Sequence, residues 1–236
     1  MSRGYIPQKP APPAGAKKKA PEPKEGDNAL WRVSEWFPDV SAKHMALLKS
    51  YHAELLKFNV RVNLISKNTE READEQHFAD SLLAIEIMRK QPLRKRIFDI
   101  GSGNGFPGLI LAILEPKIEL VLVESDARKS EFLKHVISTL KLKNATVMNA
   151  RFESLKSQEI EVALSRGFAS IAKTLLMCNK VFESGARFFH LKGNNWSSEI
   201  AELPSQLISV WQPELLGEYT LPVSQARRAI VVTQKR

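Results

Sequence analysis

The segment that most constrains the fold spans residues 97–108, where an apolar run ends in a glycine-rich turn and a helix follows. Gly101, Gly103 and Gly105 leave the backbone free to adopt positive φ and to approach a ligand closely. Pro107 then suits the first turn of a helix. A strand, a glycine loop and a helix in this order are typical of a nucleotide-cofactor loop in an α/β fold.

The spacing of the glycines bears on which cofactor this loop binds. The dinucleotide fingerprint G-x-G-x-x-G requires glycine at position 106, where this chain has Phe106. Asp99, at the end of the apolar run, adds a negative charge that repels a pyrophosphate but attracts a cationic amino group. S-adenosylmethionine carries such a group and no phosphate. We therefore predict S-adenosylmethionine as the cofactor, with a purely structural tight turn as the alternative.

A second apolar run ends in an acidic residue. Residues 118–123 are rich in strand-forming side chains, and Glu124 follows the last glycine by about the 20 residues expected for a ribose-binding acid. Its carboxylate can accept both ribose hydroxyls. The alternative is a charge near a helix N-terminus, since Ser125 and Asp126 can cap the next helix. Both NAD enzymes and methyltransferases place an acid here, so Glu124 predicts a nucleoside site without choosing between them.

Charge points to the class of partner. The 236 residues suffice for one α/β domain with a smaller accessory segment, and the net charge of +9 favours a polyanionic partner. Simple solubility is the alternative explanation of that charge. Residues 1–28 hold six of the 13 prolines and a net charge of +3, which predicts a disordered basic tail. This tail resembles neither a secretory signal nor a transit peptide.

Other absences narrow the class further. The sequence has no run of about 18 apolar residues that could span a membrane. Cys178 is the only cysteine, which argues against intrachain disulfides and cysteine-cluster metal sites, and its apolar setting predicts a core residue. We expect a cytoplasmic protein that binds no metal and no membrane and acts as a monomer.

Periodicity divides the chain after the tail. Residues 29–92 repeat apolar side chains at three- and four-residue spacing, which predicts an α-helical segment. Residues 93–236 alternate strand and helix patterns, which predicts a parallel doubly wound sheet. The expected strands lie near residues 96–100, 118–123, 145–149, 161–165 and 186–191, and the expected helices near 107–114, 127–140, 168–182 and 195–203.

Two further strands are expected near residues 206–212 and 228–234. No crossover helix separates them, so they should form an antiparallel pair at the sheet edge. Five parallel strands and a terminal antiparallel hairpin make the seven-stranded mixed sheet of the class I S-adenosylmethionine-dependent methyltransferases. We predict this Rossmann-like α/β fold, with ligands beyond the carboxyl ends of the strands.

Several motifs together resemble one family. Residues 98–108 resemble the loop of the bacterial small-subunit ribosomal RNA guanine-N7 methyltransferases, once called glucose-inhibited division protein B. The resemblance covers residues 41–236. It departs at Gly167, where the family usually has alanine, and at Arg128 and Lys129, whose order is reversed. The other similar segments are residues 51–64, 77–81, 124–133, 151–153, 165–169 and 191–193.

The resemblance implies an enzyme that methylates N7 of a guanine in 16S ribosomal RNA, as naked rRNA, as the small ribosomal subunit or as its assembly intermediate. It implies that Phe106 lines the cofactor, that Phe152 and Glu153 bracket the adenine, and that Arg166 lies at the cofactor or the target base. Core packing is the alternative for Phe152, and a structural salt bridge for Arg166. The predicted cofactor-binding residues are Asp99, Gly101, Ser102, Gly103, Phe106, Glu124, Phe152, Glu153 and Arg166.

Methylation at guanine N7 requires few catalytic groups from the protein. Guanine N7 already carries an in-plane lone pair, so no general base is expected and positioning does most of the catalytic work. We predict Arg166 as the catalytic residue, since its forked donors suit phosphate or the O6 and N7 edge of guanine. His77 and Asp80, spaced i and i+3 on a helix, are expected to be structural. The predicted RNA contacts are Arg128, Lys129, Arg151, Lys192 and Arg227.

Two other functions remain open at this point. A nicotinamide-dependent dehydrogenase would share the sheet and Glu124, but it predicts glycine at position 106 and leaves the basic charge unexplained. A non-catalytic rRNA-binding or ribosome-assembly protein on a methyltransferase fold would keep the charge and lose the cofactor. The intact glycine loop argues against the second alternative.

Overall fold

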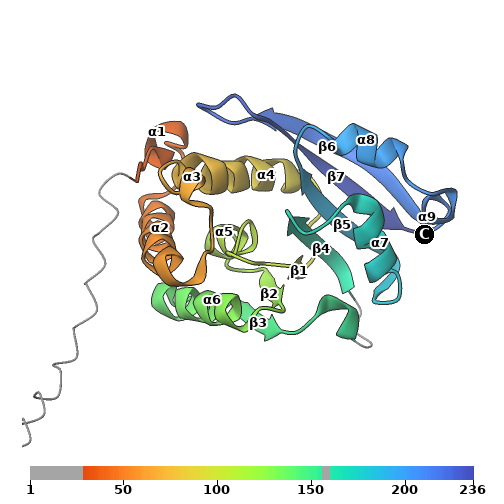
Figure 1. Cartoon of the computed structure of the whole chain (residues 1–236), viewed down its shortest axis with the longest axis horizontal. Helices are drawn as coiled ribbons and strands as arrows, with labels where there is room; N and C mark the ends of the chain where they lie inside the picture. The colour runs from red at the N-terminus through yellow and green to blue at the C-terminus, as the bar shows by residue number, and fades with distance from the viewer. Residues whose placement is uncertain (1–28, 156–159) are drawn as a thin grey trace, which may run out of the picture.

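The computed structural model describes residues 29–155 and 160–236, so the predicted tail of residues 1–28 lies outside the described residues. The strands are β1 Arg96–Ile100, β2 Glu119–Glu124, β3 Ala145–Asn149, β4 Ile160–Arg166, β5 Phe182–Lys192, β6 Trp211–Thr220 and β7 Arg227–Lys235. They form one seven-stranded sheet in the order β3-β2-β1-β4-β5-β7-β6 (Figure 1). Strands β1 to β5 pair in parallel, and β7 lies antiparallel between β5 and β6.

Helices cover both faces of this sheet (Figure 1). Neighbouring residues of a strand face opposite sides, so Ile97 joins one hydrophobic core and Phe98 the other. The helical segments are α1 Val33–Trp36, α2 Ala42–Val62, α3 Lys67–Glu70, the π-helix η1 Asp74–Ala79, α4 Asp80–Met88, α5 Gly108–Leu114, α6 Ala127–Leu140, the 3-10 turn η2 Phe152–Ser154, α7 Ile171–Cys178, α8 Trp196–Ala201 and α9 Ser205–Ile208.

The helices that precede the sheet pack into its core. Leu48, Tyr51 and Leu55 of α2 are fully buried in the same hydrophobic cluster as residues of α5 and α6. The other face of the sheet is covered by α7, α8 and α9, with Cys178 buried there as expected. The boundaries proposed at residues 28 and 92 stay a prediction. Among the described residues, no helix has the length and apolarity needed to cross a membrane.

The predicted strand at residues 206–212 is wrong. Ser205–Ile208 forms the short helix α9, which follows Pro204 as the fixed φ of proline allows, and β6 begins only at Trp211. The sequence pattern of β6 is hard to recognise as a strand, because it contains Pro213 and Gly217, two residue types that are depleted in strands. The pairing with β7 also has a register shift between Leu215 and Gly217. An antiparallel pair at the sheet edge nevertheless forms, as predicted, between β6 and β7.

The strand order changes direction between β1 and β4. From β1 the sheet continues to one side through β2 and β3, and from β4 it continues to the other side through β5. In doubly wound folds the carboxyl ends of the strands open a crevice at such a switch point. The loops that follow β1, β2, β4 and β5 therefore meet at one end of the sheet, where a ligand is expected.

Candidate active site

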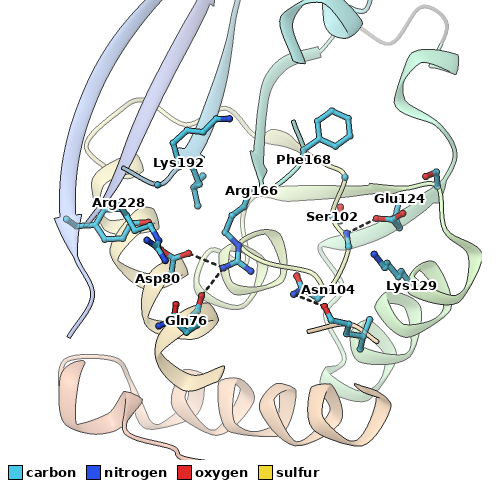
Figure 2. Close-up of a pocket in the computed structure, with 18 residues that line it drawn as sticks. Gln76, Asp80, Ser102, Asn104, Glu124, Lys129, Arg166, Phe168, Lys192 and Arg228 are labelled. Atoms are coloured by element: carbon cyan, nitrogen blue, oxygen red, sulfur yellow. Dashed lines mark hydrogen bonds and ion pairs between the residues drawn. The ribbon is translucent and has the colours of Figure 1, made fainter. Parts of the chain in front are cut away.

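A cavity of about 800 Å³ lies at the carboxyl ends of the parallel strands (Figure 2). Its walls come from the loops after β1, β2, β4 and β5, from the helical segment before the sheet, and from the terminal hairpin. The lining residues are Leu64, Gln76, Asp80, Gly101, Ser102, Gly103, Asn104, Glu124, Ser125, Lys129, Arg166, Gly167, Phe168, Leu191, Lys192, Gly193, Tyr219 and Arg228.

The glycine loop forms one wall of this cavity. The backbone N–H groups of Gly101 and Ser102 donate to the Val123 carbonyl at 2.9 and 3.1 Å, which ties the loop to β2. Gly101 has φ +69°, and a Cβ there would overlap the ring of Phe168. Gly103 has φ +53° and faces open space, since a Cβ there would meet only the Gly101 carbonyl at 3.7 Å. The loop therefore needs glycine for both conformation and close packing.

Glu124 lies beside this loop on the same wall, with its carboxylate held in place by two backbone groups. Its Oε2 accepts from the Gly103 N–H at 2.8 Å, and its Oε1 accepts from the Asp126 N–H at 2.7 Å. The cap of α6 is Asp126, whose side chain accepts from the N–H groups of Arg128 and Lys129. Glu124 therefore lies near the N-terminus of α6 without capping it and lines the cavity in a fixed orientation, so its assignment to the ribose stays a prediction.

The structure places two predicted cofactor residues beneath the loop rather than on the cavity wall. Asp99 is buried, and its Oδ2 accepts from the Gly108 N–H at 3.2 Å, while Oδ1 has no partner among the described residues. Burial raises the pKa of Asp99 to about 8. Phe106 is also buried and stacks on Tyr51, whose hydroxyl donates to the Asn104 carbonyl. Both residues support the loop from below.

A second hollow, of about 200 Å³, adjoins the loop on its other side and shares Gly101 and Phe168 with the main cavity. The buried Phe152 and the exposed Glu153 line it, so the structure brings both predicted adenine-binding residues beside the glycine loop. Arg151 lines this hollow and not the main cavity. The remaining lining residues are Val123, Ser125, Ala150 and Met177.

Arg166 ends β4 and enters the main cavity from the wall opposite Glu124 (Figure 2). Its Nη1 donates to the Gln76 carbonyl and to Asp80 Oδ2, each at 3.0 Å. Its Nη2 lies 2.9 Å from His77 Nδ1, and the guanidinium carbon lies 5.3 Å from the centre of the Phe106 ring. Burial, reinforced by the charge of Arg166, lowers the pKa of His77 well below its usual range, so this imidazole is neutral and accepts from Arg166.

Asp80 connects Arg166 to the terminal hairpin. While Oδ2 accepts from Arg166, Oδ1 accepts from the Tyr219 hydroxyl at 2.9 Å and lies 3.6 Å from Arg228 Nε. The side chain of Asp80 is 4% exposed, so these donors replace the hydrogen bonds that water would give to an exposed carboxylate. We name Asp80, Arg166, Tyr219 and Arg228 the carboxylate hub.

The π-helix η1 presents several of these groups. Asp74 accepts from the backbone and guanidinium of Arg32, which fixes the chain that precedes α2. Glu75 accepts from the N–H groups of Val223 and Ser224, each at 2.7 Å, which fixes the turn between β6 and β7. The next residues along the chain supply the contacts to Arg166. Single π-turns of this kind are frequent at functional sites.

The predicted RNA contacts occupy different surroundings. Lys192 lines the cavity, but its ammonium donates to the Ala169 carbonyl at 2.7 Å and to Glu199 at 2.8 Å, and it points away from Asp80 (Figure 2). Arg227 is exposed and pairs with Glu218 at 3.2 Å outside the cavity. Arg128 is exposed beside Asp126, whereas Lys129 lines the cavity.

Gln76, Asn104 and Tyr219 line the cavity, although no sequence pattern selects them as site residues. Asp80 was predicted to be structural. Its position could have indicated a role in the site, because a charged residue at the start of the apolar helix α4 is buried with it. A buried carboxylate requires partners, so its position predicts cations from elsewhere in the chain.

The sheet has the strand order of a class I methyltransferase fold, with the last-inserted strand β7 antiparallel to its neighbours. The glycine loop after β1 and the acidic residue that ends β2 complete the pattern of this fold. Solved structures share the arrangement. MtNAS in complex with MTA and tNA has a TM-score of 0.56 and 14% identity, over 90% of this chain and 84% of that chain. The YcgJ protein from Bacillus subtilis has a TM-score of 0.51 and 13% identity, over 68% of this chain and 99% of that chain.

The family follows from sequence comparison. The model of the GidB family, described as rRNA small subunit methyltransferase G, matches residues 44–216, and the chain belongs to this family. Ribosomal RNA small subunit methyltransferase G 3 of Bdellovibrio bacteriovorus is 48% identical over 206 residues, covering 87% of this chain and 93% of that protein. Ribosomal RNA small subunit methyltransferase G of Desulfotalea psychrophila is 38% identical over 191 residues, covering 78% and 87%.

Family membership confirms the predicted fold class, the predicted family, an S-adenosylmethionine-dependent methyltransferase activity and rRNA as the substrate class. It leaves no support for the dehydrogenase or the non-catalytic assembly protein. The roles of individual residues stay predictions, and the geometry above supplies the arguments for them.

Proposed function

We propose that this protein transfers a methyl group from S-adenosylmethionine to N7 of a guanine in 16S ribosomal RNA, within the small ribosomal subunit or its assembly intermediate, as a cytoplasmic monomer. One observation carries the proposal. The glycine loop with Glu124 and the guanidinium of Arg166 line opposite walls of a single cavity. A nucleoside cofactor and a base to be methylated can therefore meet there.

The cofactor-side residues fit S-adenosylmethionine. Glu124 presents a fixed carboxylate toward the cavity, as ribose hydroxyls require, and Gly103 leaves the loop open for a ligand. The second hollow has a largely apolar lining that includes Phe152 and Phe168, which suits the flat face of adenine. We assign Glu124 to the ribose, Phe152 and Glu153 to the adenine, and the glycine loop to the methionine moiety.

The bound cofactor supplies an electrophilic methyl group. Because guanine N7 already holds a lone pair, the chain needs no group that removes a proton. Arg166 cannot serve as a base at neutral pH, since its guanidinium stays protonated. Its role is to donate hydrogen bonds to the O6 edge of the guanine or to the adjacent phosphate. Asp80, His77 and the Gln76 carbonyl hold the guanidinium before substrate arrives, so little reorganisation is needed.

The decisive experiment measures transfer of labelled methyl from S-adenosylmethionine to small ribosomal subunits from a strain that lacks this protein. Nucleoside analysis should show 7-methylguanosine at one position. Naked 16S rRNA and assembly intermediates are tested in parallel, so that the preferred substrate form is identified. Arg166→Gln is the matched control and should bind cofactor without transferring label. Label in a different nucleoside, or none in any substrate form, would overturn the proposal.

A further inference from the structure

The substrate side of the cavity carries more positive charge than its one carboxylate offsets. Arg166 and Arg228 both face Asp80, and the carboxylate contributes one negative charge against two positive ones. S-adenosylmethionine has no phosphate, and its one carboxylate belongs to the methionine moiety, which is assigned to the glycine loop on the opposite wall, so Arg228 is not needed for the cofactor. Guanine itself is neutral. The surplus charge therefore calls for an anion supplied by the substrate.

Arg228 has a donor available for such an anion. Its Nε lies 3.6 Å from Asp80 Oδ1, and its Nη1 donates to the Arg227 carbonyl at 3.2 Å. Within residues 29–155 and 160–236, no acceptor binds its Nη2. The side chain is 27% exposed and lines the cavity, so the free edge of the guanidinium is accessible from the cavity.

Side chains alternate between the two faces of β7, so only one of its two adjacent arginines enters the cavity. Arg228 pairs with Tyr219 in the β6–β7 register, and both side chains reach Asp80. Arg227 points to the other face of β7, is 67% exposed, and pairs with Glu218. No sequence pattern separates these two adjacent arginines, of which Arg227 was the predicted RNA contact, whereas the geometry favours Arg228.

We propose that Arg228 binds a phosphodiester group of the target nucleotide and that Asp80 and Tyr219 are the positioning residues that aim it. The assignment rests on the proposed function, because it takes the cavity to hold RNA. A guanidinium suits this task, since its planar fork can donate two parallel hydrogen bonds to phosphate oxygens. Arg166 is then left to face the guanine base.

The test compares two variants that each remove one positive charge from β7, Arg228→Gln and Arg227→Gln. Affinity for the small ribosomal subunit is measured as a function of salt, because each lost phosphate contact lowers the slope of log K against log salt by about 1. We expect this loss for Arg228→Gln, a clearly smaller one for Arg227→Gln, and unchanged S-adenosylmethionine affinity for both. Arg228→Lys keeps the charge and should keep the slope while weakening binding.

Two results would overturn the assignment: a wild-type slope for Arg228→Gln, or an equal loss for Arg227→Gln, which would indicate diffuse surface charge. If Arg228→Gln fails to fold, Arg228→Lys decides, because an unchanged affinity in that variant would exclude a forked phosphate contact. Nucleoside analysis of the wild-type product runs on the same subunits. A wrong methylated nucleoside would overturn the proposed function and leave the slope comparison standing.

Discussion

The two walls of the cavity are built in different ways. The cofactor-side wall comes from one short stretch, the glycine loop and Glu124, and is held by backbone N–H groups. The substrate-side wall is the carboxylate hub, whose members meet across as many as 148 residues of chain, from Asp80 to Arg228, and are held by charged side chains. The first wall is therefore sensitive to added side-chain atoms, whereas the second is sensitive to lost charge.

The substitution Asp80→Asn should have the largest effect. It removes the buried carboxylate from Arg166 and Arg228, whose side chains are 17% and 27% exposed, and breaking a buried ion pair from one side costs about 3–5 kcal/mol. We expect a lower free energy of unfolding and loss of methyl transfer, with cofactor affinity retained. Urea unfolding, calorimetric titration with S-adenosylmethionine and the methyl-transfer assay measure the three quantities.

Glu218→Gln is the matched control for this substitution, because it removes a carboxylate from an exposed pair with Arg227. Exposed pairs contribute about 0–1 kcal/mol, so little change in stability is expected. If Asp80→Asn weakened cofactor binding as strongly as it weakened methyl transfer, the two walls would not be independent units.

A second prediction concerns the pH dependence of stability on the cofactor side. Burial raises the pKa of Asp99 to about 8, so the folded protein keeps a proton that the unfolded chain releases near pH 4. The stability from this group is complete below that pH and is lost as the pH rises toward 8. Asp99→Asn does not titrate, so wild type should lose up to about 1.4 kcal/mol per pH unit relative to this variant between pH 5 and 7.

Urea unfolding of both proteins at several pH values measures this difference. Asp126→Asn is the control, because hydrogen bonds from the backbone of Lys129 and Arg128 lower the pKa of Asp126, and its contribution is lost only as the pH falls below about 4. A constant difference between wild type and Asp99→Asn would contradict the prediction. Weaker cofactor binding by Asp99→Asn would instead support the sequence prediction that Asp99 contacts the cofactor.

The third prediction tests the tolerance of the cofactor-side wall to a single methyl group. Gly101→Ala places a Cβ against Phe168 and forces alanine into a backbone of φ +69°, which costs about 1–2 kcal/mol before any clash. Gly185→Ala imposes a similar strain at φ +83°, in open space. We expect both variants to lose stability, and only Gly101→Ala to lose cofactor affinity, by more than about tenfold. Equal cofactor affinities would show that Phe168 simply moves aside.

The same contrast explains what the sequence could predict. The glycine loop and Glu124 are local signals, because spacing within one strand–turn–helix unit fixes their geometry. Their neighbours Asp99 and Phe106 were assigned to the cofactor, but the side chains point beneath the loop, and spacing alone does not reveal that direction. The parallel pairing of β1 to β5 followed from the alternation of strand and helix patterns.

The carboxylate hub was not predictable in the same way. Asp80 and Arg166 are separated by 86 residues, and Asp80 and Tyr219 by 139, so no local pattern joins them. Tyr219 lies in β6, the strand whose proline and glycine led to a wrong assignment. A contact that depends on the pairing of an edge strand becomes visible only when the register of that strand is known.

The smallest effect is expected for the loss of a single tyrosine hydroxyl, a substitution that can be made on both walls of the cavity. Tyr219→Phe removes one hydrogen bond to Asp80, and the raised pKa of Tyr219, caused mainly by burial, shows that its hydroxyl stays a donor. Such a loss costs about 1 kcal/mol, so kcat/KM for the ribosomal subunit should fall by about fivefold with cofactor affinity unchanged. Tyr51→Phe removes the hydroxyl that holds Asn104 in the glycine loop, and it should weaken cofactor binding instead.

A double-mutant cycle tests whether Tyr219 and Arg228 act together in the hub. Tyr219 and Arg228 share Oδ1 of Asp80, so the effects of Tyr219→Phe and Arg228→Gln on kcat/KM should not add, whereas those of Tyr51→Phe and Arg228→Gln should. Additivity of the first pair would mean that Tyr219 does not help to aim Arg228. In that case Asp80 would hold the two side chains as separate contacts, and the substrate-side wall would be no more cooperative than the loop that faces it.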